Sequence, residues 1–147
     1  MMLSFKSYHP EQLPNKEERN QLAQFLLDHL QQYGDPKDQI EKAMDYSLGI
    51  DNKPGGIIIT ASEGDQLVAA TVINKTGMEG YIPENILVYI ATHSDYRGKG
   101  VGSQLMESAI RQTEGNIALH VEPGNPARKL YEKLGFTNKY LEMRLNK

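Results

Sequence analysis

The hydrophobic period of this chain changes at residues 51–56, and that change limits the fold more than any other sequence feature. Before it, apolar residues recur at helical spacing and predict helices over residues 17–33 and 35–48. Asp35 suits the N-cap of the second helix, and Pro36 suits its first turn. After the change, runs rich in β-branched residues predict strands. Helices followed by a strand-rich region are typical of an α+β domain.

The second part of the chain predicts a mixed β-sheet flanked by helices, close to a three-layer arrangement. Its first two strands are near enough in sequence to form a hairpin, whereas a strand–helix–strand order farther along implies parallel pairing. No repeat or linker divides the chain, so residues 1–147 are expected to form a single domain. The expected elements are strands at 57–61, 66–73, 86–92, 117–121 and 140–145, helices at 100–113 and 126–134, and an irregular link at 75–85.

Composition excludes several classes of protein. With 16 Lys and Arg against 19 Asp and Glu, the chain has no basic footprint for nucleic acid. The absence of cysteine excludes disulfides and a cysteine nucleophile, and the scattered histidines predict no metal site. No apolar run is long enough to cross a membrane, and the first residues lack a signal core. We therefore expect a cytoplasmic protein with no membrane partner.

A glycine-rich segment at residues 97–102, Arg-Gly-Lys-Gly-Val-Gly, lies between a buried strand and an amphipathic helix. Glycines permit a tight turn and bring the backbone close to a ligand. A helix begins with unpaired N–H groups and a partial positive charge, which together favour a bound phosphate. Arg97 and Lys99 add full charges. The segment predicts a pyrophosphate site, and the alternative is a turn that only begins a helix.

Two better-known phosphate-binding loops do not match this segment. Lys99 is followed by Gly100, where a P-loop needs the Ser or Thr that binds magnesium. In the dinucleotide-binding pattern the third glycine would fall at Ser103, and no acidic residue ends a strand about 20 residues farther on. The segment is therefore either a phosphate-binding loop of another kind or a glycine-rich turn that only begins a helix.

Two motifs together resemble the GNAT acetyltransferase superfamily. The Arg-x-x-Gly-x-Gly pattern in residues 97–102 resembles motif A, and Ser-Asp-Tyr at 94–96 resembles its usual lead-in. Residues 125–136, Asn-Pro-Ala-Arg-Lys-Leu-Tyr-Glu-Lys-Leu-Gly-Phe, resemble motif B. The resemblance covers residues 57–145. It implies the GNAT acyl-CoA N-acyltransferase fold, with acetyl-CoA bound where the fourth and fifth strands splay apart.

The resemblance also implies roles for particular residues. Tyr131 would protonate the departing CoA thiolate, and its alternative role is that of a packed aromatic side chain. Asn125 would contact the cofactor, or it would only cap the helix, because its spacing to Tyr131 is one residue shorter than in many relatives. The main chain of the strand at 86–92, which corresponds to the fourth strand of the family's sheet, would bind the pantetheine arm. The cofactor-binding residues implied are Ile90, Ala91, Thr92, Arg97, Gly98, Lys99, Gly100, Val101, Gly102 and Asn125.

The general base is the least defined part of the implied site. An amine with a pKa near 10.4 must lose a proton before it attacks a thioester, so a base lowers the barrier. His120 occupies a position at which some relatives carry a glutamate, whereas Val88 replaces a carboxylate found in others. His120 is the first choice, against a purely structural role. Glu79 and Glu84 are alternatives that would relay a proton or attract a cationic acceptor.

The expected function is transfer of an acetyl group from acetyl-CoA to a primary amine by direct attack. The acceptor would be a small-molecule amine or a protein amino group, and no metal is expected. One alternative is a CoA-binding sensor or partner-binding module that lost catalysis. Another is a different acyl donor, such as succinyl-CoA or propionyl-CoA. The alternating strand expected at 140–145 could also pair across a homodimer.

Overall fold

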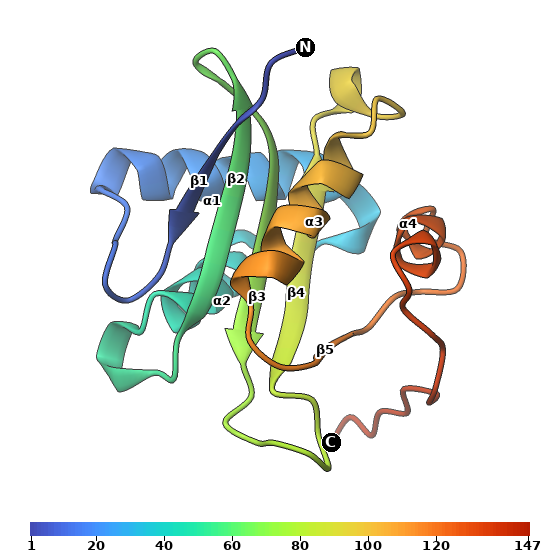
Figure 1. Cartoon of the computed structure of the whole chain (residues 1–147). Coiled ribbons are helices and arrows are strands. Elements are labelled where there is room, and N and C mark those ends of the chain that lie inside the picture. The colour runs from blue at the N-terminus through green and yellow to red at the C-terminus, as the bar shows by residue number, and fades with distance from the viewer.

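A five-stranded sheet with helices on both faces forms the centre of the computed structural model, which describes all residues 1–147 (Figure 1). The strands and helices in chain order are β1 (Ser4–Tyr8), α1 (Lys16–Leu30), α2 (Lys37–Ser47), β2 (Gly56–Glu63), β3 (Gln66–Lys75), β4 (Asn85–Thr92), α3 (Val101–Gln112), β5 (Ile117–Leu119) and α4 (Ala127–Lys133). Short 3-10 turns lie at η1 (Gln31–Tyr33), η2 (Ile50–Asn52) and η3 (Ser94–Tyr96).

The sheet is mixed and its strands follow chain order, β1-β2-β3-β4-β5. The first four strands are antiparallel to their neighbours, whereas β5 pairs parallel with β4. Helix α3 provides the crossover that a parallel pair requires. The expected α+β class and mixed sheet are confirmed.

Two hydrophobic clusters cover the two faces of the sheet. Helices α1 and α2 pack on one face, and α3 packs on the opposite face (Figure 1). Alternation along β2 divides the sheet between them, because Ile58 joins the first cluster and Ile59 the second. Helix α4 lies beside the sheet, beyond β4 (Figure 1). None of the helices is both long and apolar enough to cross a membrane.

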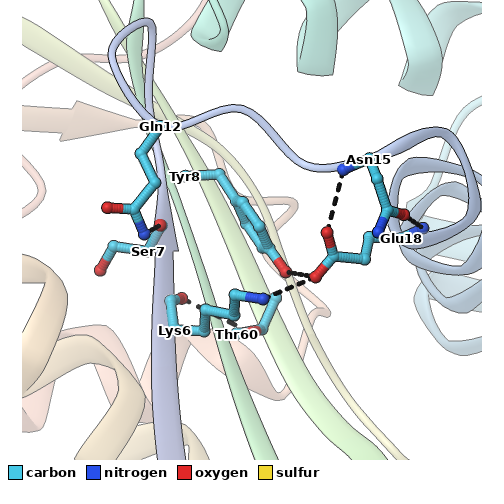
Figure 2. Close-up of polar contacts among 7 residues, drawn as sticks. All are labelled: Lys6, Ser7, Tyr8, Gln12, Asn15, Glu18 and Thr60. Carbon is cyan, nitrogen blue, oxygen red and sulfur yellow. Dashed lines mark hydrogen bonds and ion pairs between the residues drawn. The ribbon is translucent and has the colours of Figure 1, made fainter.

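Strand β1 was not among the expected elements, and side-chain contacts tie it to α1. A carboxylate oxygen of Glu18 accepts hydrogen bonds from Lys6 Nζ at 2.6 Å and from the Tyr8 hydroxyl at 2.8 Å (Figure 2). Glu18 and Asn15 also form a reciprocal capping box at the start of α1. The β1 edge of the sheet is thereby fixed to the first helix.

The junction between the first two helices differs from the expectation. Helix α1 ends at Leu30 rather than at residue 33, because Gln31 has a positive φ of 55° and opens the turn η1. The N-cap of α2 is Pro36, and the expected N-cap residue, Asp35, makes no capping hydrogen bond. The Asp35 carboxylate instead accepts a hydrogen bond from the Tyr89 hydroxyl on β4.

The strand expected at 140–145 is wrong, and the strand expected at 117–121 is shorter than predicted. Residues 137–147 make no backbone hydrogen bond, and β5 offers an edge of only 3 residues. Alternation alone does not form a strand, because strand backbone groups need a partner in reach. The apolar side chains of this segment are therefore exposed. They are Tyr140, Leu141, Met143 and Leu145.

Candidate active site

A cleft of about 390 Å³ opens where β5 separates from β4. We call it the β4 cleft. The parallel pairing runs only from Asn85↔Ile117 to Leu87↔Leu119, so the rest of β4 has no strand neighbour on that side. The splayed strands expected from the sequence are thus present. The lining residues are 32–35, 86–89 and 120–122, with Asn125 and Arg144.

The glycine segment adopts a conformation that only glycine tolerates well. Gly98 and Gly100 have φ angles of 76° and 78°. Gly102 has ordinary backbone angles but a close neighbour, since a Cβ there would lie 3.2 Å from Leu130 Cδ2 on α4. Two glycines therefore shape the turn, and the third allows α4 to approach the start of α3.

The backbone N–H groups of the glycine segment are open to a ligand. None of those from Gly98 to Ser103 donates a hydrogen bond within the chain, whereas Gln104 N–H returns to the carbonyl of Gly100. Helix α3 begins at Val101, so its positive end lies among these donors. An anion with several oxygens fits such a set of donors.

The two cations of the segment have partners of their own. Arg97 Nε donates to the carbonyl of Thr92 at 3.3 Å, and Arg97 Nη2 donates to the carbonyl of His29 at 3.1 Å. Lys99 Nζ lies 5.3 Å from the centroid of the Tyr96 ring. Arg97 therefore links the glycine segment to the end of β4 and to α1, in addition to carrying charge.

His120 and Asn125 both line the β4 cleft. The His120 side chain is 60% exposed, and its Nδ1 lies 3.9 Å from a carboxylate oxygen of Glu142. Asn125 Oδ1 accepts a hydrogen bond from the N–H of Ala127 at 2.9 Å, at the first residue of α4. The Asn125 side chain thus accepts a backbone hydrogen bond at the start of α4. The His120 imidazole is accessible to a ligand.

Tyr131 lies on α4 and is not among the residues that line the β4 cleft. It is 6% exposed, and its ring centroid is 5.8 Å from that of Phe136. Burial raises the pKa of the Tyr131 hydroxyl to about 12, so it keeps its proton at neutral pH. Tyr131 and His120 therefore do not line the same cleft.

The two loop glutamates considered as alternatives have different surroundings. Glu84 accepts hydrogen bonds from the N–H of Asn116 at 2.7 Å and from that of Gly80 at 3.0 Å. These bonds lower the pKa of the Glu84 carboxyl. The Glu79 side chain makes no hydrogen bond or ion pair within the chain, and neither glutamate lines the β4 cleft. Glu84 thus ties the β3–β4 loop to the turn before β5.

Sequence reasoning missed an acidic part of the cleft. Asp35 and Glu122 both line it, and the Tyr89 hydroxyl donates a hydrogen bond to Asp35. Tyr89 is 6% exposed, and burial together with this bond raises the pKa of its hydroxyl. The bonded pair lies 54 residues apart in sequence, so no local pattern could have joined the two residues. The only sequence signal at Asp35 was the break between the two predicted helices, which did not indicate a place in the cleft.

Comparison with known families identifies the family of this chain. Residues 54–138 match the family model of the acetyltransferase (GNAT) domain. The chain belongs to the GNAT acetyltransferase family. This GNAT chain is accordingly an acyltransferase, and its mixed sheet and helices are the GNAT acyl-CoA N-acyltransferase fold.

Solved structures share the fold of this GNAT chain at low sequence identity. An aminoglycoside N-acetyltransferase in complex with CoA is 16% identical, with a TM-score of 0.70 over 100% of this chain and 97% of that one. The ribosomal-protein-S18-alanine N-acetyltransferase from Escherichia coli is 17% identical, with a TM-score of 0.69 over 95% and 80%. A GNAT-family acetyltransferase from Streptococcus pneumoniae is 20% identical, with a TM-score of 0.70 over 99% and 98%.

Proposed function

We propose that this GNAT chain transfers an acetyl group from acetyl-CoA to a primary amine. The observation that carries the proposal is the set of unused backbone N–H groups from Gly98 to Ser103 at the start of α3. A pyrophosphate supplies oxygens for several such donors at once, and the positive helix end favours its charge. The residues present therefore fit a CoA pyrophosphate.

The pantetheine arm of the cofactor would lie along β4. Residues 88–92 have no neighbour on the β5 side, so an extended ligand can pair with their main chain as an added strand does. In this proposal Ile90, Ala91 and Thr92 hold the arm, and Arg97, Lys99 and Val101 belong to the pyrophosphate segment. The thioester would then point into the β4 cleft. Asn125 is kept as a cofactor contact through that cleft.

The chemistry proposed is direct attack, in which two side chains move protons. His120 takes a proton from the attacking amine, whose nitrogen forms a bond to the thioester carbon. The carbon–sulfur bond then breaks, and Tyr131 gives its proton to the departing thiolate. The accessibility of His120 in the cleft and the retained proton of Tyr131 support these assignments. No covalent enzyme intermediate is needed, in keeping with the absence of cysteine.

Several finer expectations remain part of the proposal. The acceptor is a small-molecule amine or a protein amino group, and the acyl group is acetyl rather than succinyl or propionyl. A cytoplasmic location and a homodimer through the terminal segment stay predictions from the sequence.

Calorimetric titration with acetyl-CoA, free CoA and ATP tests the proposal. We expect acetyl-CoA and CoA to bind with micromolar affinity and ATP not to bind. The Gly100→Ala variant should weaken binding at least about tenfold. The alanine methyl group would lie among the unused N–H groups, and the positive φ at this position would strain the turn. Gly64→Ala is the matched control, since Gly64 also has a positive φ with no neighbour but lies in the β2–β3 hairpin. Absence of binding at millimolar acetyl-CoA would refute the proposal.

A second candidate function is a CoA-binding module without turnover. The position of Tyr131 outside the cleft lining favours it. Thiol release measured with a panel of amines separates the two functions, and a chain without cysteine gives no background in that assay. Cofactor binding with no amine-dependent thiol release would support the module.

A further inference from the structure

Asp35 lies in the turn between α1 and α2, where it lines the same cleft as His120. Its carboxylate accepts a hydrogen bond from the buried hydroxyl of Tyr89. Tyr89 belongs to β4, the strand along which the proposed cofactor would lie. One oxygen of the exposed Asp35 carboxylate is therefore held by the strand next to the reacting groups.

No cation of the chain neutralises the charge of Asp35. It takes part in none of the ion pairs of the structure, and neither does Glu122 on another wall of the cleft. Arg144 is the one Lys or Arg among the lining residues, and it already pairs with Glu142. The β4 cleft thus holds two carboxylates, those of Asp35 and Glu122, that no Lys or Arg of the chain pairs with.

The remaining walls of the cleft suit an aliphatic chain. Tyr33, Val88 and Val121 contribute apolar surface between the polar groups. A cavity of about 390 Å³ has the size of sites that hold small molecules. An acceptor that fills it therefore combines a short apolar chain with positive charge.

We propose that Asp35 determines acceptor specificity by binding a second cationic group of the amine, so that the preferred acceptors are small aliphatic diamines or polyamines. This inference rests on the proposed acetyl transfer. One amine is deprotonated and acetylated near His120, and the other stays charged and donates to Asp35. Tyr89 acts as a positioning residue, because its hydroxyl holds the carboxylate in the cleft. A monoamine of the same length would lose this charged contact.

Paired acceptors provide the first test. We expect 1,4-diaminobutane to have a KM at least about tenfold below that of butylamine, which corresponds to one charge-assisted hydrogen bond. Asp35→Asn should raise the KM for the diamine by a similar factor, with little change in kcat and little effect on butylamine. Tyr89→Phe should raise the same KM by a smaller factor. Asp38→Asn is the matched control, since Asp38 lies at the start of α2 outside the cleft lining.

A titration of 1,4-diaminobutane into protein saturated with CoA provides a readout without turnover. Binding that Asp35→Asn abolishes and Asp38→Asn retains would support the inference. Equal KM values for the two amines, or a diamine affinity that Asp35→Asn leaves unchanged, would overturn it while acetyl transfer stands. Failure of CoA itself to bind is seen in the separate cofactor titration, and it would remove the proposed function and this inference together.

Discussion

Arg97 Nη2 donates a hydrogen bond to the main-chain carbonyl of His29 across 3.1 Å. The bond joins residues that lie 68 positions apart and connects the glycine segment to the last turn of α1. A second bond, to the carbonyl of Thr92, holds the same guanidinium to the end of β4. Arg97 therefore connects the glycine segment to β4 and α1, and it also places a positive charge at the proposed cofactor site.

Replacing Arg97 should affect cofactor binding more than folding. Arg97→Ala removes both bonds and one positive charge, so we expect acetyl-CoA affinity to fall about tenfold. Arg97→Lys keeps the charge but not the planar pair of donors, and it should recover only part of the affinity. Calorimetry measures both variants. Arg111→Ala, at the exposed end of α3, is the control, and an equal loss in that variant would contradict a specific role.

The contacts of Glu18 predict a loss of stability in acid. Hydrogen bonds from Lys6, from the backbone of Asn15 and from Tyr8 lower the pKa of Glu18 from 4.5 to about 2. A carboxyl whose pKa is lower in the folded state stabilises the fold above its ordinary pKa. That contribution should disappear as the pH falls from 4.5 through about 2.

Urea unfolding of Glu18→Gln at neutral and acidic pH tests this expectation. The stability difference between the wild type and the variant should shrink as the pH is lowered. Glu17→Gln is the control, because Glu17 lies in the same first turn of α1 and lacks the contact with Lys6. A difference that does not change with pH would contradict the assignment.

Tyr131→Phe tests the proposed acid in isolation. The variant keeps the buried ring, so the fold and the acetyl-CoA affinity should hold, while turnover falls about a hundredfold if the hydroxyl protonates the thiolate. Because the pKa of Tyr131 is about 12, its deprotonation should not limit the rate near neutral pH. Steady-state thiol release gives the comparison. Tyr140→Phe is the control, since Tyr140 is 79% exposed, and unchanged turnover in Tyr131→Phe would end its assignment as the acid.

Glu84→Ala separates a structural carboxylate from a catalytic one. The carboxylate caps two backbone N–H groups, so its removal should lower the melting temperature. It lies outside the cleft lining, so kcat should not change. Glu79→Ala, in the same loop and without those bonds, should alter neither quantity. A fall in kcat at an unchanged melting temperature would restore Glu84 as a proton relay.

Elements with a clear local pattern could be predicted from the sequence. The apolar face of α3 and the continuous apolar run of β4 depend on residues close in the chain, and both appear where expected. Strand β1 could not be found in this way, because Ser4–Tyr8 has only one buried residue and is a strand through its register with β2. Conversely, the alternation at 140–145 met no partner strand and formed none.

The candidate site likewise has a part that local sequence patterns predict and a part that depends on contacts between distant residues. The glycine segment is a local motif, and its conformation follows from its residues. The β4 cleft also depends on distant contacts, such as that of Asp35 with Tyr89 and the entry of Arg144 near His120. The Asp35–Tyr89 contact depends on packing of α1 and α2 on the sheet, and Arg144 enters from the segment after α4, so no local spacing in the sequence encodes either one. His120 and Asn125 could be assigned to the site only through the resemblance to the GNAT family, and both line the β4 cleft.

The short pairing of β5 has a consequence for hydrogen exchange. Only three register pairs join β5 to β4, from Asn85↔Ile117 to Leu87↔Leu119. Opening this segment exposes few buried groups, so its amides should exchange faster than those of β2 and β3 at the centre of the sheet. His120, Asn125 and Tyr131 all lie beyond that weak pairing. A ligand that contacts both β4 and the segment after β5 would oppose this local opening. The protection of the β5 amides against exchange would then rise with the free energy of binding.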